Sequence, residues 1–248
     1  MKQFVILAAL AAAGVVSSAY ADTLASGSAT IDYDQAAWET LASGYGPTPV
    51  LTLSAFFSQT QADARTESQL LSDSAPATNY LGEVYNMYGP TVSGQGGGYA
   101  QPTTFTFTPG QLTLATGAIG LGGVARFAVY GGAYGNLLYG DFTLQYDTSR
   151  QALGGSGWYL KGNIPPAAAA FDLLNVSIAE SPGSFTISGD LGVSPEVANY
   201  LYSTPSDALK DVGDFTFTGI TSVPEPSSIA LVAGSLGLLW LGRKRRRA

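Results

Sequence analysis

The 248-residue chain contains no cysteine and no histidine. Without cysteine there is no disulfide and no thiol nucleophile, so packing alone must hold the fold together, although disulfides are permitted outside the cytoplasm. Without histidine, the Ser-His-Asp and Cys-His catalytic arrangements, His-ligated zinc and the commonest general base are all excluded. The catalytic chemistry that remains is that of carboxylates.

Basic residues are scarce between residues 22 and 222. The whole chain has 18 acidic and 11 basic residues. This segment keeps every acidic residue except Glu225 and only five of the basic ones, which gives it a net charge of −12. Such a surface stays soluble, repels nucleic acid and anionic membranes, and attracts divalent cations. We therefore expect no nucleic acid among the partners.

The first 21 residues have the three parts of a secretory signal peptide. Lys2 supplies the positive start, residues 4–16 form an apolar stretch, and Ala19 and Ala21 flank Tyr20 as a small-x-small cleavage site. The pattern predicts cleavage between Ala21 and Asp22. The alternative is an N-terminal anchor that is kept.

The last 26 residues, 223–248, combine a rigid motif, an apolar run and a basic end. The motif is Val223, Pro224, Glu225 and Pro226, which the two prolines keep extended. Residues 229–241 carry no charge and would rise about 20 Å as a helix, short of the roughly 30 Å hydrocarbon core, so they predict a marginal transmembrane helix. The basic end, expected to stay cytoplasmic, comprises Arg243, Lys244, Arg245, Arg246 and Arg247. A buried C-terminal helix is the alternative; a nucleic-acid-binding tail is disfavoured by the apolar run.

These three parts, in this order at the C-terminus, resemble the PEP-CTERM sorting signal of Gram-negative bacteria. The resemblance covers about a tenth of the chain. It implies handling by exosortase, a membrane-embedded protease thought to cut near the Pro-Glu-Pro motif. It also implies a protein anchored in the inner membrane before processing and then placed at the cell surface or outside the cell, often where exopolysaccharide or biofilm matrix is made.

Between the two signals, residues 22–222 are long enough for one domain. Threonines and aromatic residues alternate in 103–108, 142–146, 185–188 and 215–218, which is typical of half-buried antiparallel strands. Further strands are expected at 50–57, 112–114, 124–130 and 171–178. Two short helices are expected, one capped by Asp34 and one beginning at Ser194-Pro195-Glu196, with a helical turn at 205–211. The pattern predicts an all-β, antiparallel β-sandwich of jelly-roll or Greek-key type, followed by the C-terminal membrane helix.

Carboxylates are the only candidates for metal binding or catalysis. Asp32 with Asp34, and Asp141 with Asp147, could supply oxygen ligands to calcium, although no Asp-x-Asp-x-Asp-Gly loop is present. A carboxylate-only glycosidase would need two acids to converge, and the aspartates near predicted strand ends are Asp32, Asp34, Asp141, Asp147, Asp172 and Asp190. The alternative is that these residues are turn formers and solvated charges.

Tyrosines gather around glycine-rich loops and could present flat rings to sugars. The alternative is that they pack as amphipathic side chains. The tyrosines concerned are Tyr80, Tyr85, Tyr88, Tyr99, Tyr130, Tyr134 and Tyr139.

The sequence therefore predicts an exported, non-enzymatic surface or extracellular-matrix protein, sorted and processed by an exosortase-type system. One alternative is a module that binds exopolysaccharide, with calcium assisting. A carboxylate-only glycosidase is a third and weaker hypothesis.

Overall fold

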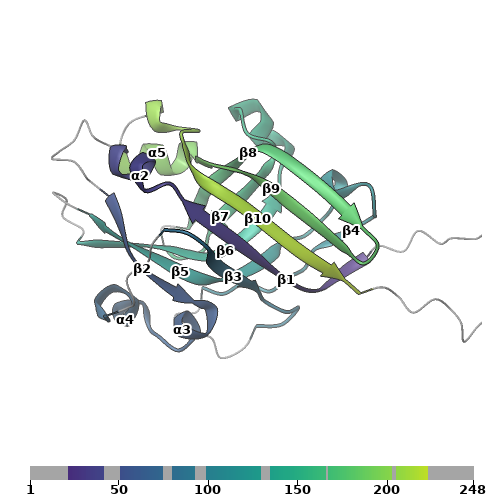
Figure 1. Ribbon diagram of the computed structural model, residues 1–248, viewed down its shortest axis with the longest axis horizontal. Helices are drawn as coiled ribbons and strands as arrows, with labels where there is room; N and C mark the ends of the chain where they lie inside the picture. The colour runs from purple at the N-terminus through teal and green to yellow at the C-terminus, as the bar shows by residue number, and fades with distance from the viewer. Residues whose placement is uncertain are drawn as a thin grey trace, which may run out of the picture.

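The computed structural model describes residues 22–41, 51–74, 80–92, 99–129, 135–165, 167–202 and 205–222. Within these residues ten strands form one antiparallel sheet, in the order β10-β9-β8-β7-β6-β5-β3-β1-β4, with β2 paired to β5. The sheet closes on itself because β1 also pairs with β10. Eight of the strands therefore form a barrel (Figure 1).

From β5 to β10 each strand pairs with the next one along the chain, as in an up-and-down meander. Around the ring the strands are β1 (Asp22–Tyr33), β10 (Asp211–Thr221), β9 (Ser184–Val193), β8 (Ala168–Ser181), β7 (Trp158–Gly162), β6 (Asn136–Tyr146), β5 (Ile119–Val129) and β3 (Glu83–Met87). Two strands lie beside the ring: β2 (Leu51–Ser58) pairs with the second half of β5, and β4 (Thr106–Phe107) pairs with the start of β1.

The predicted β-sandwich is wrong. β1 and β10 stay paired from Ser26↔Ile220 to Tyr33↔Gly213, so no free edge separates two sheets there. Period-two alternation identifies a half-buried strand, but the inward face of a barrel and the inner face of a sandwich show the same period. The two architectures differ in whether the first and last strands pair with each other. The pattern of residues along the chain does not reveal that pairing.

Aromatic side chains fill the barrel. An eight-stranded barrel has an interior just wide enough for side chains to occupy it completely. Tyr33 and Tyr85, both fully buried, join their hydroxyl groups at 2.8 Å, which satisfies two polar groups inside the apolar interior. The other large buried aromatic residues are Trp38, Phe127, Phe142, Trp158, Phe171, Phe185, Phe215 and Phe217.

Helix α2 (Gln35–Thr40) covers one end of the barrel. Asp34 caps it by accepting a hydrogen bond from Ala37 N at 3.0 Å, which confirms the predicted cap. The helix thereby directs Trp38 inward, where its ring stacks on Phe127 with centroids 4.5 Å apart. The edges of Tyr33 and Phe171 complete the contact.

Strand β4 and the residue before it fill the opposite end. Phe105 and Phe107 lie on one face, as the alternation predicted, and both pack on Phe185, with centroids 6.0 and 5.0 Å away. The strand predicted at 112–114 is wrong: these residues form a 3₁₀ turn, η3 (Leu112–Leu114). The chain leaves the Pro109-Gly110 turn through this helical turn and returns to pair Thr116 with Thr106.

A smaller apolar core lies outside the barrel wall. Helices α3 (Gln59–Asp63) and α4 (Glu67–Ser72), which the sequence left unassigned, each begin with a capping box. Helix α3 packs on β2 and β5, and α4 packs on β6. The buried residues of this core are Ala55, Phe57, Ala62, Leu70, Val124 and Ile164. The remaining helical segments are η4 (Thr148–Leu153), α5 (Pro195–Tyr202) and η5 (Pro205–Asp207). The predicted start of α5 is confirmed, because Ser194 Oγ accepts from Val197 N at 3.0 Å.

In the part of the chain that the structure describes, no helix has the length and apolar character needed to cross a bilayer. The described helices are all short, and the transmembrane helix predicted at 229–241 lies outside the described residues.

We predict that Trp38→Ala lowers the free energy of unfolding by about 4 kcal/mol, because it deletes a fully buried indole and leaves a cavity. Urea unfolding followed by circular dichroism measures this. Leu114→Ala is the control, because this side chain is 72% exposed and its loss should cost less than about 0.5 kcal/mol. Equal unfolding midpoints for the two variants would contradict the role given to Trp38.

Candidate functional site

The two ends of the barrel chain meet at one pole. Ser222 N donates to Thr23 O at 3.0 Å, and the two side-chain hydroxyl groups lie 2.9 Å apart. Asp22, which follows the predicted cleavage point, pairs with Phe107 as the first residue of β1. Ala19 and Ala21 lie outside the described residues, as do the motif Val223, Pro224, Glu225 and Pro226 and the basic end at 243–247. Both predicted signals therefore join the barrel at this pole, which we call the terminal pole.

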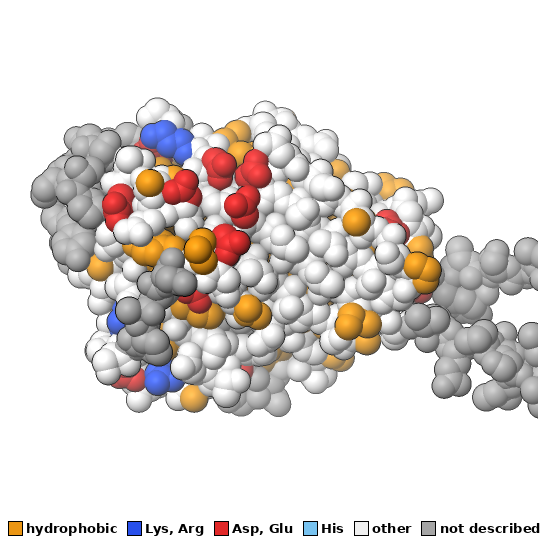
Figure 2. All heavy atoms as spheres, viewed as in Figure 1, with side chains coloured by type: hydrophobic (Ala, Val, Ile, Leu, Met, Phe, Trp, Pro, Cys, Tyr) orange, Lys and Arg blue, Asp and Glu red, His pale blue; other side chains and the backbone are white. Residues whose placement is uncertain are grey.

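The opposite end of β1 and β10 carries an acidic patch. Asp32, Asp34 and Asp214 line an open hollow of about 450 Å³. Partial burial, followed by the charges of Asp190, Asp211, Asp32 and Asp34, raises the pKa of Asp214 above its usual value. Figure 2 shows acidic side chains gathered on this part of the surface, near α2 and the start of β10. We call this end the acidic pole.

The structure brings together the first of the two predicted calcium pairs. Asp32 and Asp34 both line the hollow, but each has a local partner: Asp32 accepts from Gly82 N at 2.5 Å and Asp34 caps α2. Among the described residues, no group of three or more carboxylates, histidines or cysteines is arranged to hold a metal ion.

The second predicted calcium pair is not formed. Asp141 and Asp147 are six residues apart along and just beyond β6, which places their backbones roughly 20 Å from each other. Asp147 caps η4 by accepting from Ser149 N at 2.8 Å. Asp141 is 4% exposed and lies under the outer core.

Asp141 belongs to a buried carboxyl cluster with Asp63 and Tyr88. The Tyr88 hydroxyl donates to Asp63 Oδ1 at 2.7 Å and lies 3.4 Å from Asp141 Oδ1. Gly123, at φ 143° in a bulge of β5, brings its N–H to 3.5 Å from the same oxygen. Burial, with the nearby charge of Asp63, raises the pKa of Asp141 to about 6. The cluster links α3 to the barrel wall.

Arg150 holds another buried carboxylate. Its Nη2 donates to Asp172 Oδ2 at 2.6 Å, its Nε contacts the second oxygen of Asp172, and Nη1 and Nη2 donate to the two oxygens of Glu196 at 2.6 and 2.9 Å. This network joins η4, β8 and α5. Asp190 accepts from Asn175 Nδ2 at 2.6 Å at the acidic pole. The six aspartates considered for catalysis are thus divided among separate structural settings and do not share one cleft.

The tyrosines predicted to bind sugars divide into two groups. Tyr80, Tyr85 and Tyr88 are buried and pack as interior or wall residues. Tyr99 and Tyr139 are partly exposed, whereas Tyr130 and Tyr134 lie outside the described residues.

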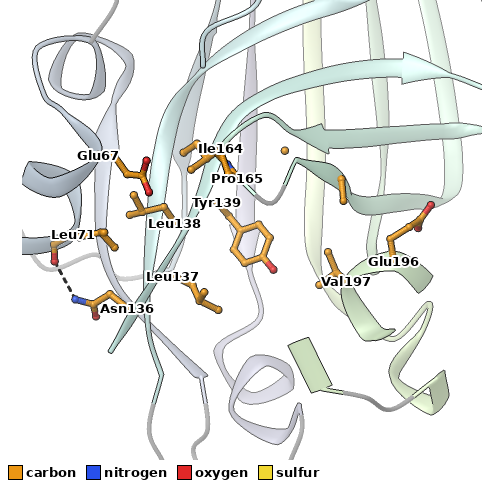
Figure 3. Close-up of a pocket in the computed structure, with 13 residues that line it drawn as sticks. Glu67, Leu71, Asn136, Leu137, Leu138, Tyr139, Ile164, Pro165, Glu196 and Val197 are labelled. Carbon is orange, nitrogen blue, oxygen red and sulfur yellow. Dashed lines mark hydrogen bonds between the residues drawn. The ribbon is translucent and has the colours of Figure 1, made fainter. Parts of the chain in front are cut away.

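Tyr139 lies in a cleft of about 460 Å³ between α4, β6 and α5. In Figure 3 its ring stands between Glu67 on one side and Glu196 with Val197 on the other. No local pattern in the sequence indicates this cleft, because its walls come from separate segments of the chain, of which α4 and α5 are more than a hundred residues apart. The remaining lining residues are Leu71, Asn136, Leu137, Leu138, Gly140, Gly162, Ile164, Pro165 and Ala168.

Comparison of the chain with protein-family models, with curated proteins and with solved structures found no match. The function is therefore argued from the residues and their geometry.

We predict that the protein loses stability as the pH rises from about 4 to 7. Burial raises the pKa values of Asp141 to about 6 and of Glu83 to about 7, so the folded state holds these protons more tightly than the unfolded chain. The stabilisation from the protonated side chains is complete below their pKa values in the unfolded chain. It is lost as the pH rises through their pKa values in the folded protein. Asp141 alone accounts for a loss of about 2 kcal/mol across this window.

Asp141→Asn should flatten the pH dependence of the unfolding free energy, measured by urea unfolding at a series of pH values. Asparagine suits the left-handed backbone at this position, φ 42°, and so preserves the local fold. Glu39→Gln on α2 is the control, since Glu39 bonds Gln35 outside this cluster. If the unfolding free energy of Asp141→Asn falls as steeply with rising pH as that of the unaltered protein, Asp141 is not the source of the pH dependence.

Proposed function

We propose that the protein is an exported, non-enzymatic component of the cell surface or extracellular matrix, sorted and processed by an exosortase-type enzyme. The observation that supports this proposal is that the first and last segments of the barrel meet at the terminal pole, where Thr23 bonds Ser222. A signal at either end can be removed there without breaking a barrel strand. The barrel is then a self-contained cargo between two temporary segments.

The packing of the barrel supports a role as cargo. Its interior is filled by aromatic side chains and covered at the two ends by Trp38 and Phe105. It contains no cysteine, so its stability does not depend on the redox state of the compartment it enters. These properties suit a protein that must persist outside the cell.

In this proposal the C-terminal segment holds the protein at the inner membrane until processing. The apolar residues 229–241 contact the membrane, the basic residues 243–247 stay on the cytoplasmic side, and the motif at 223–226 is presented to the exosortase-type partner. Because Thr221 and Ser222 are tied to the barrel at the terminal pole, the motif begins immediately outside a folded body. Release to the surface or medium follows the cut.

Polysaccharide binding is a second candidate function, and one observation favours it. The cleft beside Tyr139 combines a partly exposed aromatic ring, an apolar wall and two glutamate side chains. A ring beside hydrogen-bonding groups suits a sugar, which has apolar faces and hydroxyl edges.

We predict that changing Pro224, Glu225 and Pro226 together to alanine leaves unprocessed protein in the inner membrane, because the processing enzyme no longer recognises the rigid motif. Membrane fractionation and mass spectrometry of the accumulated form measure this. Ser227→Ala with Ser228→Ala, directly after the motif, is the matched control and should be processed normally. Normal release of the triple variant would refute the proposed role of the motif.

A further inference from the structure

The cleft beside Tyr139 is built from elements that the fold brings together from four parts of the chain. α4 supplies Glu67 and Leu71, β6 supplies residues 136–140, the connection between β7 and β8 supplies Ile164 and Pro165, and α5 supplies Glu196 and Val197. Each wall is anchored to the barrel or to the outer core. The cleft is therefore a preformed feature of the folded protein.

The polar groups of the cleft offer acceptors. Glu67 Oε2 accepts from the Tyr99 hydroxyl at 2.6 Å, and among the described residues Oε1 has no donor. Asn136 uses Nδ2 to donate to Leu71 O at 3.0 Å, which orients its Oδ1 as an acceptor. A ligand that complements this cleft must donate hydrogen bonds.

The charge of the cleft is negative. The described partner of Glu67 is a neutral hydroxyl, so its carboxylate charge is not balanced by that contact. Arg150 is shared between Glu196 and the buried Asp172, so this group of three carries a net charge of −1. An anionic ligand such as a uronic acid is repelled, whereas a cation is attracted.

The remaining surface of the cleft is apolar. Leu137, Leu138, Ile164 and Val197 line it together with the ring of Tyr139. A purely aliphatic ligand could cover this surface but would leave Glu67 Oε1 without water and without a donor, which is costly. The fitting ligand has an apolar face, several donors and a positive charge.

We propose that this cleft binds an amino-sugar unit, that is, a sugar ring that carries a protonated amine. The ring's apolar face lies against Tyr139 and the aliphatic wall, the amine pairs with Glu67, and a hydroxyl donates to Asn136 Oδ1. An aromatic ring also favours a nearby ammonium group. This inference rests on the second candidate function, polysaccharide binding, and specifies the site and the sugar class.

The test is calorimetric titration of the full chain in mild detergent at pH 6 with a glucosamine tetramer. The same tetramer in fully N-acetylated form and a tetramer of galacturonic acid are titrated in parallel. We expect the amine form to bind at least about tenfold more tightly than the acetylated form, because it alone forms a charged hydrogen bond, and the uronic acid form not to bind. Preference for the uronic acid, or no binding of any tetramer, would overturn the proposal.

Two variants locate the binding. Glu67→Gln should lower the affinity for the glucosamine tetramer about tenfold, because it removes the charge of the side chain and keeps its shape. Asp214→Asn removes one charge from the hollow at the acidic pole, which shares no lining residue with the cleft, and should leave affinity unchanged within about twofold. If both variants weaken binding of the tetramer equally, the protein attracts the cation only through its general acidity. If Glu67→Gln leaves the affinity unchanged, the site lies elsewhere. Either result overturns the proposal.

The ring is tested separately from the charge. Tyr139→Phe keeps the aromatic face and should retain binding, whereas Tyr139→Leu should weaken it by about tenfold. Because Tyr139 also contacts Phe127, with centroids 5.9 Å apart, both variants are first shown to unfold at the urea concentration of the unaltered protein. If the glucosamine tetramer does not bind while processing at 223–226 is normal, only this inference is disproved. If processing does not occur as proposed while the tetramer still binds, only the exosortase proposal is disproved.

Discussion

The pairing of β1 with β10 is the constraint on which the rest of the structure depends. It joins the first and last strands over most of their length, from Ser26↔Ile220 to Tyr33↔Gly213, and so turns one antiparallel sheet into a closed barrel. Closure creates the interior that the aromatic residues fill and removes two long strand edges that could pair with other chains. It also sets the two ends of the domain side by side at the terminal pole, with the acidic pole opposite.

The outer elements are tied to this barrel by buried polar groups. Asp141 with Tyr88 and Asp63 fastens α3 to the bulged part of β5 and β6, and Arg150 with Asp172 and Glu196 fastens α5 and η4 to β8. A buried carboxylate is stable only when it is protonated or well bonded. The first cluster meets this requirement partly by a raised pKa and the second by a guanidinium group. The second cluster also fixes Glu196 of α5, which lines the cleft beside Tyr139.

Local features were predictable from the sequence, and relations between distant segments were not. The strands at 142–146, 185–188 and 215–218 and the caps at Asp34 and Ser194 follow from alternation and hydrogen-bonding chemistry close in the chain. The strand Glu83–Met87 was missed because its burial runs against residue type: Glu83 is buried and Val84 is exposed, so apolar alternation does not mark its faces. The barrel itself, the Asp63–Asp141 cluster and the cleft all depend on which distant segments meet, which no local pattern records.

Amide hydrogen exchange of the full chain, read by mass spectrometry over β1 and β10, tests barrel closure most directly. Closure predicts that amides between Ser26 and Tyr33 and between Gly213 and Ile220 exchange as slowly as those of the paired strands β8 and β9. In the closed barrel β10 lies between β1 and β9, and β1 pairs with β10 and, over Ser28–Ile31, with β3. Rapid exchange along one edge of β1 and one edge of β10 would mean that the sheet is open there. The shared terminal pole, and with it the account of a cargo with two removable ends, would then be wrong.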